Sequence, residues 1–112
     1  MIQAGDFVLV YLINPTEKFW GELGDFGVAG VILCGISVSS FDDWVAQAAR
    51  REPPSLGLST MFVPLFRIER IFLDEAVGDV ESYRQRFQGR VGVTVEEYLG
   101  LGAGDEGGDV PS

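Results

Sequence analysis

Five short segments of the chain are rich in β-branched, aromatic and other apolar residues, a composition typical of β-strands. Asn14-Pro15 follows the first segment and indicates a turn. Gly21 lies inside the second, where it predicts a bend or a close approach of two backbones. A proline cannot donate to a sheet ladder, so the last apolar stretch divides at a sharp bend, Pro64-Leu65-Phe66. The five predicted strands span residues 6–13, 17–26, 28–38, 59–63 and 67–73.

A helix is predicted between the third and fourth strands, over residues 40–51. Ser39-Ser40 supplies a cap, and Asp42-Asp43 supplies the negative charge that is favoured in a first helical turn. Pro53-Pro54 ends the helix. Its apolar face, at helical spacing, consists of Phe41, Trp44, Val45 and Ala48.

Two shorter helices are predicted after the last strand. Residues 79–90 have helical periodicity, and Thr94-Val95-Glu96-Glu97 is a capping-box pattern that opens a helix ending near Leu99. Residues 101–112 are glycine-rich and poor in apolar side chains, which predicts a flexible tail. The apolar face of the 79–90 helix would consist of Val80, Tyr83 and Phe87.

This order of elements predicts a mainly β fold with helices. Short strands with glycine bends around a small core favour a strongly bent, partly open five-stranded barrel. A length of 112 residues suits one compact domain. We therefore expect a small barrel with its inserted helix at 1–75, a helical appendage at 76–100, and the tail.

The second strand contains Phe19-Trp20-Gly21-Glu22-Leu23-Gly24-Asp25-Phe26, in which Gly21, Leu23 and Phe26 have a Gly-x-Leu-x-x-aromatic spacing. With the order of strands, this stretch resembles the Sm-like family (the LSm and Hfq type) over residues 6–73. The resemblance implies an SH3-like barrel. It also implies a homo-oligomeric ring, in which the fourth strand of one subunit pairs with the fifth strand of the next. Candidate residues for this self-association edge are Met61, Phe62, Val63, Ile68 and Ile71.

The resemblance does not extend to the residues with which that family contacts RNA. The family has an Asp after the aromatic residue and an Asn a few positions later, whereas this chain has Gly27 and Val31. The Arg-Gly or Lys-His of the family's last motif is replaced by Pro64-Leu65-Phe66. An Sm-like RNA-binding protein is therefore the alternative hypothesis, and it would need other cationic residues.

The net charge of −9 disfavours partners that are rich in phosphate, because their binding depends on Lys and Arg. Lys18 is the only lysine. The charge argues against DNA and leaves RNA as a disfavoured partner. The arginines of the C-terminal half either pair with carboxylates on solvated faces or gather into a surface for an anion, RNA or a partner. They are Arg67, Arg70, Arg84, Arg86 and Arg90.

Catalytic chemistry has little support in this sequence. The chain has no histidine, which removes His-dependent acid–base catalysis, His-activated nucleophiles and the usual zinc sites. Cys34 lies in an apolar run and is interpreted as a small buried residue. The paired carboxylates Asp42-Asp43 and Asp74-Glu75 are interpreted as a helix start and a strand end. We therefore predict no enzyme, no cofactor and no metal site.

The apolar runs, of which residues 7–13 and 28–33 are the longest, are too short to span a membrane. Residues 1–6 lack the basic cluster of a secretory signal, so we expect a cytoplasmic protein with no membrane partner.

Four aromatic residues would form either the core or a peptide groove. They are Trp20, Trp44, Tyr83 and Phe87. The sequence thus favours a non-enzymatic, small β-barrel module that self-associates or binds a protein partner.

Overall fold

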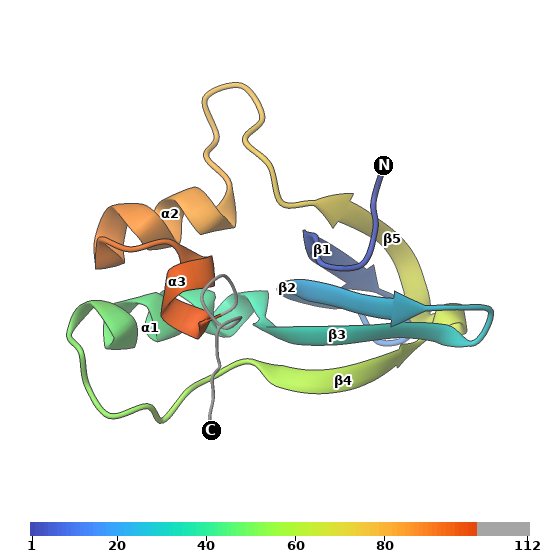
Figure 1. The fold of residues 1–112 in the computed structure, drawn as a ribbon. Helices are drawn as coiled ribbons and strands as arrows, with labels where there is room; N and C mark the ends of the chain where they lie inside the picture. The colour runs from blue at the N-terminus through green and yellow to red at the C-terminus, as the bar shows by residue number, and fades with distance from the viewer. Residues whose placement is uncertain (101–112) are drawn as a thin grey trace.

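The computed structural model describes residues 1–100, which form one antiparallel sheet and a group of helices at one end of it (Figure 1). The strands are β1 (Phe7–Leu12), β2 (Glu17–Phe26), β3 (Gly30–Ser37), β4 (Ser59–Pro64) and β5 (Ile68–Leu73). The helices are α1 (Val38–Ala49), the 3₁₀ helix η1 (Leu65–Arg67), α2 (Tyr83–Val91) and α3 (Val95–Leu99). The predictions of five strands, a helix after the third strand and C-terminal helices are confirmed.

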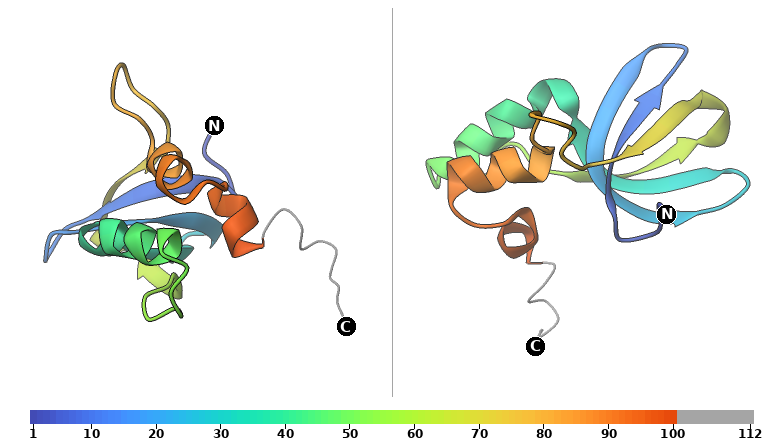
Figure 2. Two further views of the ribbon diagram at one scale, coloured as in Figure 1. Left: turned by 90° about the vertical axis from the view of Figure 1, so that its left-hand side faces the viewer. Right: turned by 90° about the horizontal axis from the view of Figure 1, so that it is seen from above.

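The sheet has the order β4-β3-β2-β1-β5, so the last two strands of the chain form its two edges. η1 joins these edges at the end of the sheet away from the helices, and the sheet is strongly curved (Figure 2). The bend predicted at Pro64-Leu65-Phe66 coincides with η1. The sheet is not a closed barrel, because β4 and β5 do not pair with each other in the described part of the chain.

Alternate residues of the strands define two faces of the sheet. The inner face is apolar and buried, as in β1, where Val8, Val10 and Leu12 all point to it. Residues from β2, β3 and β4 complete this layer. They are Leu23, Val31, Leu33 and Val63.

The outer face is covered by the helices over one half only. Trp20 of β2 is fully buried there against Phe41 and Trp44 of α1, and Trp44 in turn packs on Phe87 of α2. Tyr83 is partly buried and meets Phe41 edge-on. The aromatic residues therefore form the core that fastens the helices to the sheet, and the interpretation as a peptide groove is wrong.

Gly21 allows the paired strands β2 and β3 to approach closely where Gly21 lies opposite Gly35. A Cβ atom at Gly21 would lie 2.2 Å from the carbonyl oxygen of Cys34 and 2.4 Å from the Cα atom of Gly35. No side chain fits in that space, so the close backbone approach predicted from the sequence is confirmed.

The start of α1 differs from the prediction. The N-cap is Ser37, whose side chain accepts a hydrogen bond from the backbone N–H of Ser39, and the helix begins at Val38 rather than at residue 40. Asp42-Asp43 therefore lies beyond the first turn, and its interpretation as first-turn charge is wrong. Cys34 is also only partly buried, because it lies on the outer face of β3.

The start of α2 was predicted four residues too early, at residue 79 instead of Tyr83. Ser82 and Gln85 form a capping box that fixes the start. Val80 precedes the helix, where it bridges to Val77 across a turn and is exposed, so it is not part of the helix face. The capping box of Thr94 at the start of α3 is confirmed. The predicted flexible tail at 101–112 lies outside the described residues.

Candidate protein-binding surface

The five residues proposed for self-association lie on the two edge strands. Met61, Phe62 and Val63 belong to β4, and Ile68 and Ile71 belong to β5. Only the Phe62 side chain is well exposed, at 55%. The other four point to the inner face and are buried or partly buried. Their side chains therefore stabilise the inner face of the sheet and do not line a free edge.

The free edge of β4 presents unpaired backbone groups. Leu65 donates to the carbonyl of Ala29 at 2.9 Å, which marks this pair as hydrogen-bonded across the β3–β4 ladder. Because bonded and non-bonded pairs alternate in an antiparallel ladder, Thr60, Phe62 and Pro64 direct their backbone groups away from β3. The N–H that Pro64 lacks would have pointed outwards, which explains how a proline fits at the end of this strand.

At the end of the sheet opposite the helices, η1 and the β2–β3 hairpin adjoin β4 (Figure 1). Exposed apolar residues lie on these segments. Phe62 is directly opposite Ile32 on the outer face, and its ring lies over Gly30. The hydrogen bond from Leu65 to Ala29 holds η1 beside the β2–β3 hairpin. We refer to the exposed apolar residues of this region as the β4 surface. They are Phe26, Val28, Ile32, Phe62, Leu65 and Phe66.

The β4 surface is built from segments that contain no charged residue. There is none between Asp25 and Asp42, and none between Glu52 and Arg67. These two segments include β3 and β4 and the hairpin that precedes β3. In a chain of net charge −9, the segments that carry the β4 surface are therefore uncharged. The pattern is visible in the sequence only as two long intervals between charged residues, and no single motif marks it.

The predicted arginine group is distributed over several elements. Arg67, at the end of η1, donates to the carbonyl oxygens of Ile13 and Pro15 and pairs with Glu17. Its guanidinium therefore anchors the β1–β2 turn to the β4–β5 junction. Arg70 on β5 lies 3.5 Å from a carboxylate oxygen of Glu69.

The remaining arginines lie on α2. Arg84 pairs with Asp74 and Glu96, and Arg86 pairs with Asp42 while stacking on the ring of Tyr83. Arg90 lines a hollow with Arg86 that also contains Asp42 and Glu81. These contacts favour the interpretation of the arginines as partners of carboxylates. Their role as an anion or RNA surface stays a prediction.

Two cations cover an aromatic pair on the outer face of β1 and β5. Tyr11 and Phe72 meet edge-on with their ring centroids 5.1 Å apart. Lys18 lies over the Tyr11 ring and Arg70 over the Phe72 ring. A base that stacked on these rings would have to displace a cation that already interacts with them.

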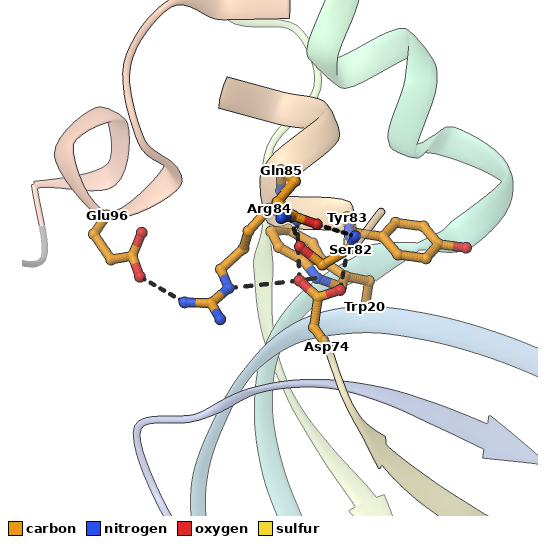
Figure 3. A network of polar contacts seen from close by, with 7 residues as sticks. All are labelled: Trp20, Asp74, Ser82, Tyr83, Arg84, Gln85 and Glu96. Carbon is orange, nitrogen blue, oxygen red and sulfur yellow. Dashed lines mark hydrogen bonds and ion pairs between the residues drawn. The ribbon is translucent and has the colours of Figure 1, made fainter. Parts of the chain in front are cut away.

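Asp74 is the centre of a polar network at the junction of the sheet and the helices (Figure 3). Its side chain is 1% exposed and accepts hydrogen bonds from Trp20 Nε1 at 3.1 Å and from the backbone N–H groups of Tyr83 at 2.7 Å and Arg84 at 3.0 Å. Arg84 Nε lies 3.6 Å from the same carboxylate. The carboxylate thus caps the start of α2, where negative charge is favoured.

A hollow of about 350 Å³ beside this network is lined mainly by carboxylates. Burial, and then the nearby charge of Glu96, raises the pKa of Glu22 above its usual value. An acidic hollow of this kind repels phosphate. The acidic residues that line it are Asp6, Glu22, Asp74, Glu75 and Glu96, together with the cation Arg84.

Within residues 1–100, no three side chains of His, Cys, Asp or Glu come together as a candidate metal site. No helix of this part of the chain is long and apolar enough to cross a membrane. Comparison with protein-family models, with curated proteins and with solved structures gives no match to this chain.

Proposed function

We propose that this chain is a non-enzymatic β-sheet module that works by protein–protein contact, through the free edge of β4 and the adjoining β4 surface. Self-association is the form of contact that we favour. The observation that carries the proposal is the combination, on one edge, of outward backbone groups at Thr60 and Phe62 with exposed apolar side chains and no charge.

The physical argument is that natural proteins normally protect such edges. Exposed edge strands are blunted by charged side chains, bulges or covering elements, because their free N–H and C=O groups otherwise pair with another strand. β4 has no charged residue and no covering element in the described part of the chain. Exposed apolar patches are typical of binding surfaces, and here the exposed Phe62 lies opposite Ile32 and beside Gly30.

The Sm-like resemblance belongs to the same proposal. Its support is the order β4-β3-β2-β1-β5, with a three-residue 3₁₀ connection between the edge strands and a glycine of β2, Gly21, that lies against the backbone of β3. A cytoplasmic location is also part of the proposal. Its support is the use of a single free cysteine, Cys34, since small secreted domains are commonly rich in disulfides.

The proposal is tested by a matched pair of variants measured by light scattering over a concentration series. Val28 and Val77 are both exposed valines in loops, at 96% and 68%, and only Val28 belongs to the β4 surface. Val28→Asp combined with Phe66→Asp should shift the native chain from an oligomeric to a monomeric mass. Val77→Asp combined with Val80→Asp, which places the same two charges on exposed valines elsewhere, should leave the oligomeric mass unchanged.

The proposal fails if two results occur together. The native chain has a monomeric mass at every concentration. The immobilised native chain also retains no protein that the immobilised Val28→Asp, Phe66→Asp variant fails to retain. Circular dichroism of both variants checks that the fold is intact, which is expected because the replaced side chains are exposed.

A further inference from the structure

We propose that the partner strand at the β4 edge is β4 of a second copy of this chain, paired antiparallel about a two-fold axis that passes beside Met61. The inference rests on the proposed function and specifies its partner and geometry. The result is a closed dimer in which the sheets of the two copies become one continuous sheet.

The alternation of backbone groups fixes the register of this pairing. Thr60 and Phe62 are the residues of β4 that have both an N–H and a C=O directed outwards. Pairing Thr60 of one copy with Phe62 of the other, and the reverse, gives two bonded pairs in which every donor meets an acceptor. Met61 then faces Met61 of the second copy in the non-bonded position between them.

The neighbouring register is less favourable because it involves Pro64. If Phe62 faced its own equivalent, Thr60 would pair with Pro64, which can accept a hydrogen bond but cannot donate one. Each of those outer pairs would leave an acceptor on Thr60 without a donor. The register centred on Met61 avoids this loss.

Charge favours a second copy at this edge and disfavours contact elsewhere. Each copy has a net charge of −9, so two copies repel one another over most of their surfaces. The β4 surface and its edge lie in segments without any charge, between Asp25 and Asp42 and between Glu52 and Arg67. Two copies that meet there bury apolar side chains without placing like charges in contact.

β5 is the less suitable partner for β4. It carries Glu69 and Arg70, and Arg67 precedes it, whereas β4 carries no charge at all. Charged residues on an edge strand protect it from pairing. A contact between β4 and β5 of different copies is also head-to-tail, which leaves free edges unless a ring closes.

Disulfide trapping tests the pairing, in a Cys34→Ser background that removes the native thiol. Residues in a non-bonded antiparallel pair have Cα atoms about 4.5 Å apart, within the range that a disulfide spans. Met61→Cys should therefore form a cross-linked dimer on mild oxidation. Ile71→Cys, the equivalent inward-facing change on β5, should not cross-link, either alone or mixed with the Met61→Cys chain.

Thr60→Pro supplies an independent measurement. The N–H of Thr60 is not used in the β3–β4 ladder, so its removal should leave the fold intact while it removes a hydrogen bond from each half of the dimer interface. The association should weaken by roughly 30-fold, the effect of losing two neutral hydrogen bonds. Thr60→Ala keeps the N–H and should associate like the native chain.

The outcomes separate this inference from the proposed function. An oligomer whose Met61→Cys chain cross-links only to the Ile71→Cys chain would overturn the two-fold pairing and leave self-association standing. An oligomer that the Thr60→Pro change does not weaken would also overturn it. A chain that is monomeric throughout would remove both. A light-scattering mass that stops at twice 12.2 kDa, with the Met61 cross-link, supports the dimer.

Discussion

The indole N–H of Trp20 donates a hydrogen bond of 3.1 Å to the buried carboxylate of Asp74, although the two residues are far apart in the sequence. Trp20 lies at the centre of the outer aromatic core, and Asp74 follows the last strand. The same carboxylate accepts the first N–H groups of α2. The bond therefore links the end of β5 and the start of α2 to the aromatic core on the outer face of the sheet.

Asp74→Asn should destabilise the protein by about 2 kcal/mol. Both carboxylate oxygens of Asp74 accept hydrogen bonds from N–H donors, so an amide must turn its NH₂ group towards at least one of them. Urea unfolding measures the loss. Asp79→Asn is the control, because Asp79 is exposed in the loop before α2 and should change the unfolding free energy little. Equal stability of the two variants would contradict the network.

Gly21→Ala should destabilise the protein by about 3 kcal/mol or more, because the added Cβ would meet the backbone of β3 at 2.2–2.4 Å. The obstructing atoms belong to the backbone and cannot turn aside as a flexible side chain can. Gly57→Ala is the matched control, since its Cβ would have no atom within 4 Å. Thermal unfolding of both variants checks the prediction, and a Gly21→Ala chain as stable as the Gly57→Ala chain would disprove the close approach of β2 and β3 at Gly21.

Much of the fold could be predicted from the sequence because strand composition and turn residues act locally. Residues 17–26 were assigned to β2 with the bounds that the structure has, and Pro64 marked the β4–β5 junction. The start of α2 was missed although Ser82 and Gln85 have the spacing of a capping box. The helical spacing of Val80 with Tyr83 and Phe87 indicates a helix that starts earlier, and it conflicts with the capping box at Ser82.

The candidate site could be predicted only in part. The edge strands followed from the order of elements, but the exposure of Phe62 depends on which half of the outer face the helices cover. The partnership of Trp20 with Asp74 depends on tertiary packing that no local pattern encodes. The arginines are a positive signal in the sequence, whereas the segment between Glu52 and Arg67 is distinguished only by its lack of charge, which no motif describes.

Glu22→Gln should stabilise the protein at neutral pH. Burial and the charge of Glu96 raise the folded-state pKa of Glu22 above 4.5, so the ionised form is disfavoured in the folded protein. The folded state then holds more protons than the unfolded state between 4.5 and that raised pKa, and stability falls as the pH rises through this window.

The gain in stability from Glu22→Gln should therefore be present at pH values above the raised pKa of Glu22. It should vanish below pH 4.5, where Glu22 is protonated in both the folded and the unfolded state. Thermal unfolding across the pH range measures it. Glu52→Gln is the comparison of opposite sign, because a hydrogen bond from Arg50 lowers the pKa of Glu52. That change should give no gain at neutral pH. A Glu22→Gln chain that is less stable than the native chain at neutral pH would contradict the assignment.

Added salt should strengthen self-association of this chain, which is the opposite of its effect on binding to a nucleic acid. The proposed contact uses an uncharged surface, so salt screens only the repulsion between copies that each carry a net charge of −9. Raising the ionic strength from ~0.01 M to ~0.15 M shortens the screening length from about 30 Å to about 8 Å. Sedimentation at the two ionic strengths should show tighter association at the higher one.

Binding to a single-stranded oligonucleotide, measured in parallel, would weaken with salt if the arginines contacted phosphate. Association that weakens with salt would mean that charged groups, and not the β4 surface, hold the copies together.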